Sequence, residues 1–226
     1  MRRSLVLLAA LCAVTSAAPA VAAPRPAKRA CGLVQDPKGD TSSPMPDREL
    51  DAQLDVLSAD VATDTKNVTV VLRLANLTAA DPANPQGRVY EFDFTAAEKN
   101  FIVLGNLLPG GNSFAVFRSD TRFEEGKGGA RAATGIGEAT GVVDTVAKEV
   151  RMTAPLSVFD PYANLRGGTL YYLSAWTYRA NGMSFQPALE QSRIEVTTSL
   201  GIGVDEAWGR KSYYRAGAPS CVRVGR

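Results

Sequence analysis

The residues best suited to chemistry are aspartates near the N-terminal end of the chain. Asp36 and Asp40 flank the turn-forming residues of the segment DPKGD, and Asp55 follows in the next apolar stretch. Hard cations such as Ca²⁺ take roughly six to eight oxygen ligands, which carboxylates and loop carbonyls supply. The spacing does not match the EF-hand loop. Two interpretations stay open: a calcium site with Asp36, Asp40 and Asp55 as ligands, or an acidic, solvated turn.

The chain contains no histidine. Ser-His-Asp and Cys-His catalysis are therefore excluded, and so is the commonest ligand of transition metals. Paired carboxylates can still hydrolyse glycosides, and Glu91 and Asp93 would share one face of a strand. Such polar faces are also usual where a sheet meets water. We therefore predict that the protein is not an enzyme, and keep a carboxylate-based glycoside hydrolase as the third alternative.

Aromatic side chains offer a second kind of contact. Tyr172, Trp176 and Tyr178 occupy alternate positions of an apolar stretch, 168–178. Such residues pack well in a half-buried sheet, which is the default interpretation. Alternatively, they line an open face on which sugar rings stack. Trp208 is expected on a surface loop, where core packing explains a tryptophan poorly. It is our first choice for ligand contact, with capping of the domain end as the alternative.

The N-terminal residues have the pattern of a secretory signal peptide. Residues 1–23 combine Arg2 and Arg3, a short apolar run and small residues at the expected cleavage site. The apolar run is shorter than the roughly 20 residues of a membrane-spanning helix, and no later segment is long and apolar enough. We therefore expect a secreted, extracellular protein with no membrane span in the mature chain.

An exported protein meets an oxidising environment, in which cysteines pair. Cys31 and Cys221 remain after removal of the signal peptide, so we predict a disulfide that brings the two chain ends together. A reactive or metal-binding cysteine pair is the alternative. Arg2 and Arg3 account for the formal net charge of +2. The mature chain has no basic excess, so nothing indicates a nucleic-acid partner.

The elements that position these residues are short strands. In the segment 68–74, four apolar residues alternate with a mixed set, which indicates one face on a core. The turn formers of 64–67 join it to 54–61 in a hairpin. Further strands are expected at 88–94, 101–104, 113–118, 141–143, 149–153 and 168–178, with a short helix or crossover at 155–159 and a flexible glycine-rich connection at 126–141.

This rhythm predicts an all-β protein: a single antiparallel β-sandwich, jelly-roll-like or immunoglobulin-like, with few or no long helices. Residues 24–30 are expected to form a flexible lead-in, and 31–226 a single domain that is long enough for a core. The order of the strands cannot be read from the sequence.

The DPKGD segment, the strand LDVLSADV and the strand VTVVLRL together resemble the start of bacterial secreted β-sandwich modules. That group includes carbohydrate-binding family 9-like and DOMON-like modules and the C-terminal module of glucodextranase-type enzymes. The middle of the chain matches only by strand rhythm. The resemblance implies a ligand such as a sugar or haem, or none known. It also implies structural calcium at Asp36, Asp40 and Asp55, while a haem ligand is disfavoured by the absence of histidine.

The expected function is therefore that of an exported, non-catalytic binding module. Its expected ligand is a carbohydrate or cell-wall polymer, with Trp208, Trp176, Tyr172 and Tyr178 as ligand-binding residues and calcium as a structural ion. The alternative is a cell-surface structural or protein-interaction domain without a small ligand, whose partner would be a surface protein. An exposed tryptophan in a groove would favour the carbohydrate-binding module.

Overall fold

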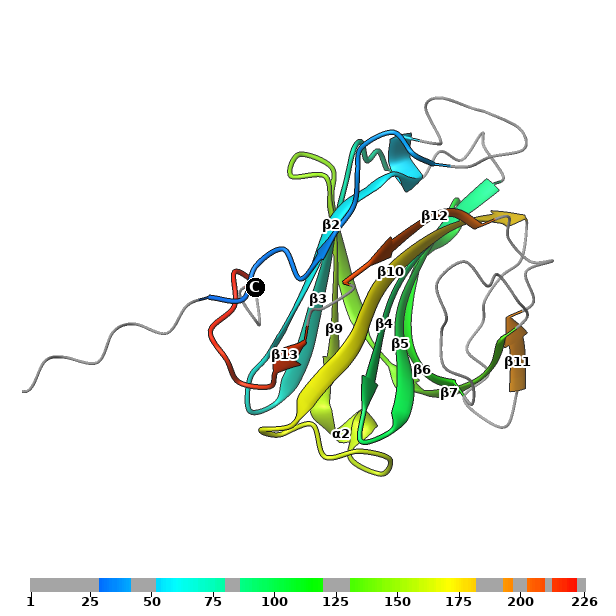
Figure 1. The fold of residues 1–226 in the computed structure, drawn as a ribbon. Coiled ribbons are helices and arrows are strands. Elements are labelled where there is room, and N and C mark those ends of the chain that lie inside the picture. The colour runs from blue at the N-terminus through cyan, green and yellow to red at the C-terminus, as the bar shows by residue number, and fades with distance from the viewer. Residues whose placement is uncertain are drawn as a thin grey trace, which may run out of the picture.

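Two antiparallel sheets pack face to face in the computed structural model, which describes residues 29–41, 52–79, 86–119, 131–181, 193–196, 203–209 and 213–222 (Figure 1). The smaller sheet has the strand order β1-β2-β3-β9-β8, and the larger has the order β11-β7-β6-β5-β4-β10-β12, with β13 paired to β10. The prediction of an all-β sandwich with few helices is confirmed. The signal peptide predicted for 1–23 and most of the lead-in lie outside the described residues.

The strand bounds are as follows. The smaller sheet consists of β1 (Val34–Gln35), β2 (Val56–Thr63), β3 (Asn67–Leu74), β8 (Thr140–Asp144) and β9 (Glu149–Pro155). The larger sheet consists of β4 (Gln86–Ala96), β5 (Lys99–Leu108), β6 (Gly111–Ser119), β7 (Arg131–Glu138), β10 (Thr169–Asn181), β11 (Arg193–Val196), β12 (Gly203–Trp208) and β13 (Tyr214–Arg215). A short helix, α2 (Leu156–Phe159), follows β9. No helix in the described parts of the chain is long and apolar enough to cross a membrane.

The hairpin of β2 and β3 forms where the sequence predicts it. The Asp64 carboxylate accepts hydrogen bonds from the backbone N–H groups of Lys66, at 2.6 Å, and Asn67, at 2.7 Å. This local bonding is why aspartate favours tight turns. Strand β2 begins at Val56, two residues later than the predicted start at residue 54, because residues 52–54 form a helical turn.

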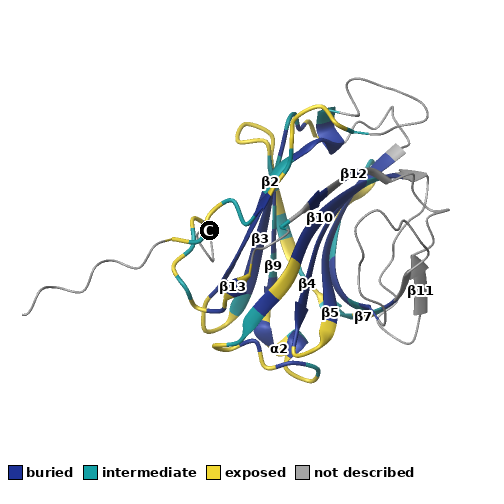
Figure 2. Cartoon of the chain, viewed as in Figure 1, coloured by how far each residue is buried: buried dark blue, intermediate teal, exposed yellow. Residues whose placement is uncertain are grey.

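The main core lies between the sheets and is closed at one end by α2. Phe94 and Phe101 from the larger sheet meet Phe159 of α2, with ring centroids 5.3 to 5.8 Å apart. Burying one such ring stabilises the fold by about 2 kcal/mol. The opposite face of the larger sheet is buried as well, at Ile102, Phe117 and their neighbours. Figure 2 shows the central strands of this sheet, β4 and β5, largely in the colour of buried residues. A central strand that is apolar on both sides, expected at 101–104, is therefore confirmed.

The flexible connection predicted for 126–141 is wrong where the structure describes it, because residues 131–138 and 140–144 form β7 and β8. The glycines there make room for neighbouring side chains. A Cβ atom at Gly137 would lie 2.7 Å from both methyl carbons of Val158, and one at Gly141 would meet the Phe114 ring. Glycine in a strand often marks such a close approach. Residues 126–130 lie outside the described part.

The first and last described segments of the chain lie side by side. Cys31 and Cys221 form a disulfide with Cα atoms 5.3 Å apart, across a sequence separation of 190 residues. Next to it, the Ala30 N–H donates to the Pro219 carbonyl at 2.8 Å. The predicted disulfide and the predicted closeness of the ends are confirmed. Closing so long a loop stabilises the folded state by about 5 kcal/mol in the chain-entropy account.

The packing of β7 against α2 can be tested by adding one methyl group. We expect Gly137→Ala to lower the free energy of unfolding by about 1 kcal/mol or more, because the β-branched Val158 cannot rotate out of the way. Urea denaturation measures the change. Gly110→Ala is the control, since no atom lies within 4 Å of its Cβ position. Equal effects of the two substitutions would contradict this account of the glycine.

Candidate metal centre

Three aspartates from distant parts of the chain meet at one point. Asp36 follows β1, Asp40 lies beyond the adjoining turn, and Asp205 lies in β12. One carboxylate oxygen from each residue lies within 4.8 Å of those from the other two. Asp205 is buried, Asp36 is partly buried and Asp40 is exposed, so the cluster reaches from the protein interior to its surface.

Backbone hydrogen bonds place the first two aspartates. The pairing of β1 with β2 ends at Gln35 and Ser58, and the Asp36 N–H extends it by donating to the Leu57 carbonyl at 3.2 Å. The turn then passes through Gly39, whose φ of +85° lies in the left-handed region that favours glycine. This conformation reverses the chain so that Asp40 returns toward Asp36.

Asp205 joins the two sheets at the cluster. It pairs with Thr177 of β10, while one of its carboxylate oxygens accepts the N–H of Val56 at 2.6 Å. The strand that carries it contacts both β1 and β2 (Figure 1). The larger sheet therefore supplies one carboxylate, and the segment beside the smaller sheet supplies two.

Asp55 lies beside this cluster and is 3% exposed. Its Oδ2 accepts the Gly39 N–H at 2.8 Å, which holds the turn that carries Asp40. Its Oδ1 is buried and has no hydrogen-bond partner. Burial raises the pKa of the Asp55 carboxyl above its usual value, against the lowering effect of the Gly39 N–H, and the Asp40 charge raises it further. A buried carboxylate oxygen of this kind calls for a cation or a proton.

The charges of the cluster oppose one another. Two unit charges about 4 Å apart repel by about 1 kcal/mol in water and by about 4 kcal/mol near a protein surface. A divalent cation would reverse the sign of this energy. The cluster offers only oxygen atoms, which suits hard cations such as Ca²⁺ and Mg²⁺ and does not suit soft metals that prefer nitrogen and sulfur.

Two of the three predicted metal ligands, Asp36 and Asp40, thus lie together, with Asp55 adjoining them through the Gly39 turn. Asp205 was not predicted. Its position follows from the pairing of β12 with β10, and that pairing is long-range. No spacing in the sequence connects residue 205 to the segment 36–40.

The predicted aromatic residues do not share one face. Between the pairs Tyr171–Thr95 and Ser174–Asp93, two residues of β10, Tyr172 and Leu173, oppose a single residue of β4. This is a β-bulge, and Tyr172 has a φ of +50° within it. The extra residue shifts the alternation, so Tyr172 departs from the face of Trp176 and Tyr178. The expectation that all three line one face is therefore wrong.

Trp176 and Tyr178 pack against each other on the larger sheet. Their rings are parallel within 1°, with centroids 6.4 Å apart. Trp176 is 6% exposed, and its Nε1 donates to the Ser174 hydroxyl at 3.1 Å. As placed, this indole does not offer an open face to a sugar ring.

Trp208 is the last residue of β12 and pairs with Ser174, so the surface loop predicted for it is wrong. The segment is short and contains two acidic residues, which hides its strand character in the sequence. The Trp208 side chain lies outside the described part of the structure. Its proposed role as a ligand contact stays a prediction.

Three tyrosines are exposed near the bulge, and we call them the tyrosine patch: Tyr171, Tyr172 and Tyr213. They are 49%, 51% and 64% exposed, respectively. The pairing of β13 with β10 joins residues 214 and 170, and Tyr213 and Tyr171 are the chain neighbours of this pair. Only Tyr172 was predicted as a contact residue, because the bulge and this pairing are invisible in the sequence.

Glu91 and Asp93 share a face, as expected for alternate residues of a strand, and both are buried. They pair with Trp176 and Ser174 of β10, and the Ser174 hydroxyl donates to Asp93 Oδ2 at 3.4 Å. Within the described residues, neither carboxylate presents an open face to a substrate, because they are 1% and 0% exposed. The hydrolase alternative therefore gains no support from it.

The buried charge of Asp55 can be tested in the absence of metal. With EDTA at neutral pH, we expect Asp55→Asn to raise the free energy of unfolding by about 1 kcal/mol, because the amide keeps an acceptor for Gly39 and removes a buried charge. Chemical denaturation measures it. Asp144→Asn is the control, since that exposed turn residue loses a charge that water already solvates. A clear loss of stability in Asp55→Asn would contradict the prediction.

Comparisons with known proteins give no match, whether with protein-family models, with characterised proteins or with solved structures. What the protein does is therefore inferred from its own residues.

Proposed function

We propose that the protein is an exported, non-catalytic binding module that holds a structural calcium ion and binds a carbohydrate or cell-wall polymer. The observation that carries this proposal is the cluster of Asp36, Asp40 and Asp205, whose carboxylate oxygens lie within 4.8 Å of one another. The resemblance of residues 36–74 to secreted carbohydrate-binding modules supports the ligand class.

Calcium suits the cluster better than magnesium does. Ca²⁺ accepts an irregular set of carboxylates, loop carbonyls and water, whereas Mg²⁺ demands near-ideal octahedral geometry and keeps much of its own water. The turn of residues 36–40 carries two of the carboxylates, and Asp55 adds a buried carboxyl group beside them. A bound ion would join the N-terminal segment to β12.

Export is supported by two independent features. Residues 1–23 have the composition of a signal peptide. Cys31 and Cys221 form a disulfide between the chain ends, and disulfides persist in oxidising compartments outside the cytosol.

The tyrosine patch is the proposed contact surface for the ligand. A tyrosine ring offers a flat apolar face to the C–H face of a sugar, and its hydroxyl both donates and accepts hydrogen bonds. Tyr172 holds its left-handed backbone at a cost of about 1 kcal/mol or more, and such conformations cluster at functional sites. Tyrosine is also enriched at protein interfaces, so a surface protein is the alternative partner.

The calcium site is tested by thermal unfolding of the mature protein. We expect millimolar Ca²⁺ to raise the Tm by several degrees over EDTA, because an ion at 100 times its Kd stabilises by about 2.7 kcal/mol. Asp205→Asn should abolish this rise, since it removes a ligand charge and keeps an acceptor for Val56. Asp144→Asn should retain it. An unchanged Tm across millimolar calcium in the wild-type protein would reject the site.

The tyrosine patch is tested with polysaccharides and cell-wall preparations in calcium. We expect the triple substitution Tyr171→Ala, Tyr172→Ala and Tyr213→Ala to weaken binding at least tenfold, because each aromatic contact contributes about 0.5 to 1.5 kcal/mol. Sedimentation with the insoluble polymer measures binding. Val146→Ala, at a side chain that is 93% exposed, is the matched surface control. Wild-type affinity in the triple variant would place the contact elsewhere, and binding only to a surface protein would favour the alternative partner.

A further inference from the structure

Two of the three clustered aspartates lie on a segment that has little strand pairing and is anchored in the core by Val34. Asp36 and Asp40 belong to residues 29–41, whose only strand is the two-residue β1. Among the described strands, β1 pairs only with β2. Asp205, by contrast, lies in β12, which pairs with β10 from Ser174 to Tyr178. The cluster therefore forms only while this N-terminal segment stays docked on the body of the sandwich.

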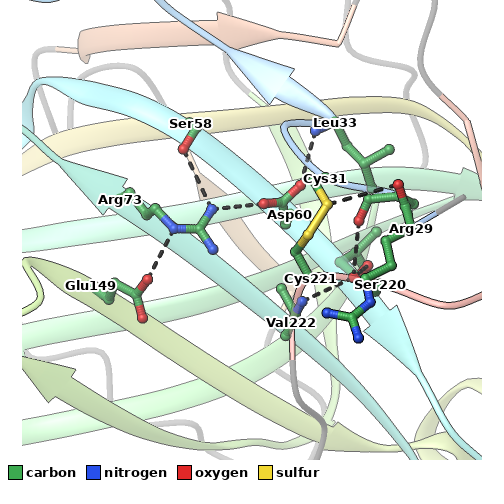
Figure 3. A network of polar contacts seen from close by, with 12 residues as sticks. Arg29, Cys31, Leu33, Ser58, Asp60, Arg73, Glu149, Ser220, Cys221 and Val222 are labelled. Atoms are coloured by element: carbon green, nitrogen blue, oxygen red, sulfur yellow. Dashed lines mark hydrogen bonds and ion pairs between the residues drawn. A yellow bond between two sulfur atoms is a disulfide. The ribbon is translucent and has the colours of Figure 1, made fainter.

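The disulfide is one of the main attachments of that segment. Cys31 lies shortly before Asp36 and is bonded to Cys221 near the other chain end. Around the bond, the Cys221 N–H donates to the Ala30 carbonyl at 3.1 Å. The Ser220 hydroxyl lies 3.3 Å from the same carbonyl and 3.2 Å from that of Val61 in β2 (Figure 3). The two chain ends thus hold each other against the smaller sheet.

A buried aspartate provides the next attachment along the chain. The Leu33 N–H donates to Asp60 Oδ1 at 2.9 Å, and the Arg73 guanidinium donates to Asp60 Oδ2 at 2.7 Å (Figure 3). Arg73 in turn donates to Glu149 of β9 at 2.9 Å. These contacts lie between the disulfide and Asp36, and only four residues separate Cys31 from Asp36.

We propose that the Cys31–Cys221 disulfide and calcium binding at Asp36, Asp40 and Asp205 are thermodynamically coupled. Reduction of the disulfide lowers the calcium affinity, and bound calcium protects the disulfide from reduction. This inference rests on the calcium site of the proposed function. Both the disulfide and the ion favour the docked segment, and each therefore reduces the ordering cost that remains for the other. Linkage requires the two effects to be reciprocal.

A reductant can reach the disulfide from solvent, because Cys31 and Cys221 are both exposed. A dithiol reductant attacks one sulfur through its thiolate and passes through a mixed disulfide. Two electrons and two protons move to the protein, whose S–S bond breaks to give two thiols, while the dithiol becomes a disulfide. The reverse exchange with an oxidised dithiol restores the bond.

The first experiment compares calcium affinity with and without the disulfide. Isothermal titration with Ca²⁺ is performed on the full mature chain in its oxidised form and on the double variant Cys31→Ser, Cys221→Ser. We expect the variant to bind about tenfold more weakly, within the range usual for coupled sites. Equal affinities would count against the coupling.

The second experiment uses the wild-type disulfide and needs no cysteine variant. Dithiothreitol reduces the protein in calcium or in EDTA, samples are alkylated at intervals, and mass spectrometry counts the free thiols. We expect reduction to be several times slower in calcium. Asp205→Asn should remove this protection, whereas Asp144→Asn should retain it.

The outcomes separate the two proposals. If the oxidised wild-type protein does not bind calcium, the calcium site is rejected and the coupling with it. If it binds calcium but the reduction rate is the same in calcium and EDTA, the coupling is overturned and the calcium site stands. A double variant that fails to fold leaves the decision to the reduction rate.

Discussion

Mutual repulsion among buried and half-buried carboxylates is the constraint on which this end of the sandwich depends. Asp36, Asp40 and Asp205 would separate if their backbones were free to move, yet hydrogen bonds hold the chain around them. The Val56 N–H fixes Asp205, and the Gly39 N–H fixes Asp55 under the turn. The fold therefore supplies part of the ordering that a cation would otherwise have to impose. Preorganised oxygen ligands of this kind are what a hard cation requires.

A buried carboxylate also fixes the N-terminal segment nearer the disulfide. Asp60 is almost fully buried and satisfies both the Leu33 N–H and the Arg73 guanidinium. The Arg73 side chain stays 33% exposed, so water screens the ion pair and its net contribution to stability is small, but loss of Arg73 would leave the buried Asp60 charge uncompensated. The main effect of this network is to position the chain: it fixes where the N-terminal segment crosses β2, before the chain reaches Asp36 and Asp40.

The sequence predicts those structural features that depend only on residues close together in the chain. The alternation of 68–74 and the Asp64 turn are local, and the structure contains both. The bulge at Tyr172 and the position of Asp205 depend on pairing with strands far away, which leaves no local pattern. The glycines of β7 and β8 misled the prediction for a similar reason. These positions need glycine because Val158 and Phe114 approach the backbone closely. The glycine content alone indicates a flexible loop, so β7 was not predicted.

Strand β10 runs from the aspartate cluster to the tyrosine patch and keeps the two proposed sites apart. Its residue Thr177 pairs with Asp205 of the cluster, whereas its residue Leu170 pairs with Tyr214 beside the tyrosine patch. At about 3.3 Å per residue, the two ends of this stretch lie on the order of 20 Å apart. An ion at the cluster therefore cannot coordinate the part of a ligand that sits on the tyrosines. For a ligand confined to the tyrosines, calcium would act on binding only through the stability of the sandwich, so a folded protein without calcium should keep its affinity for such a short ligand.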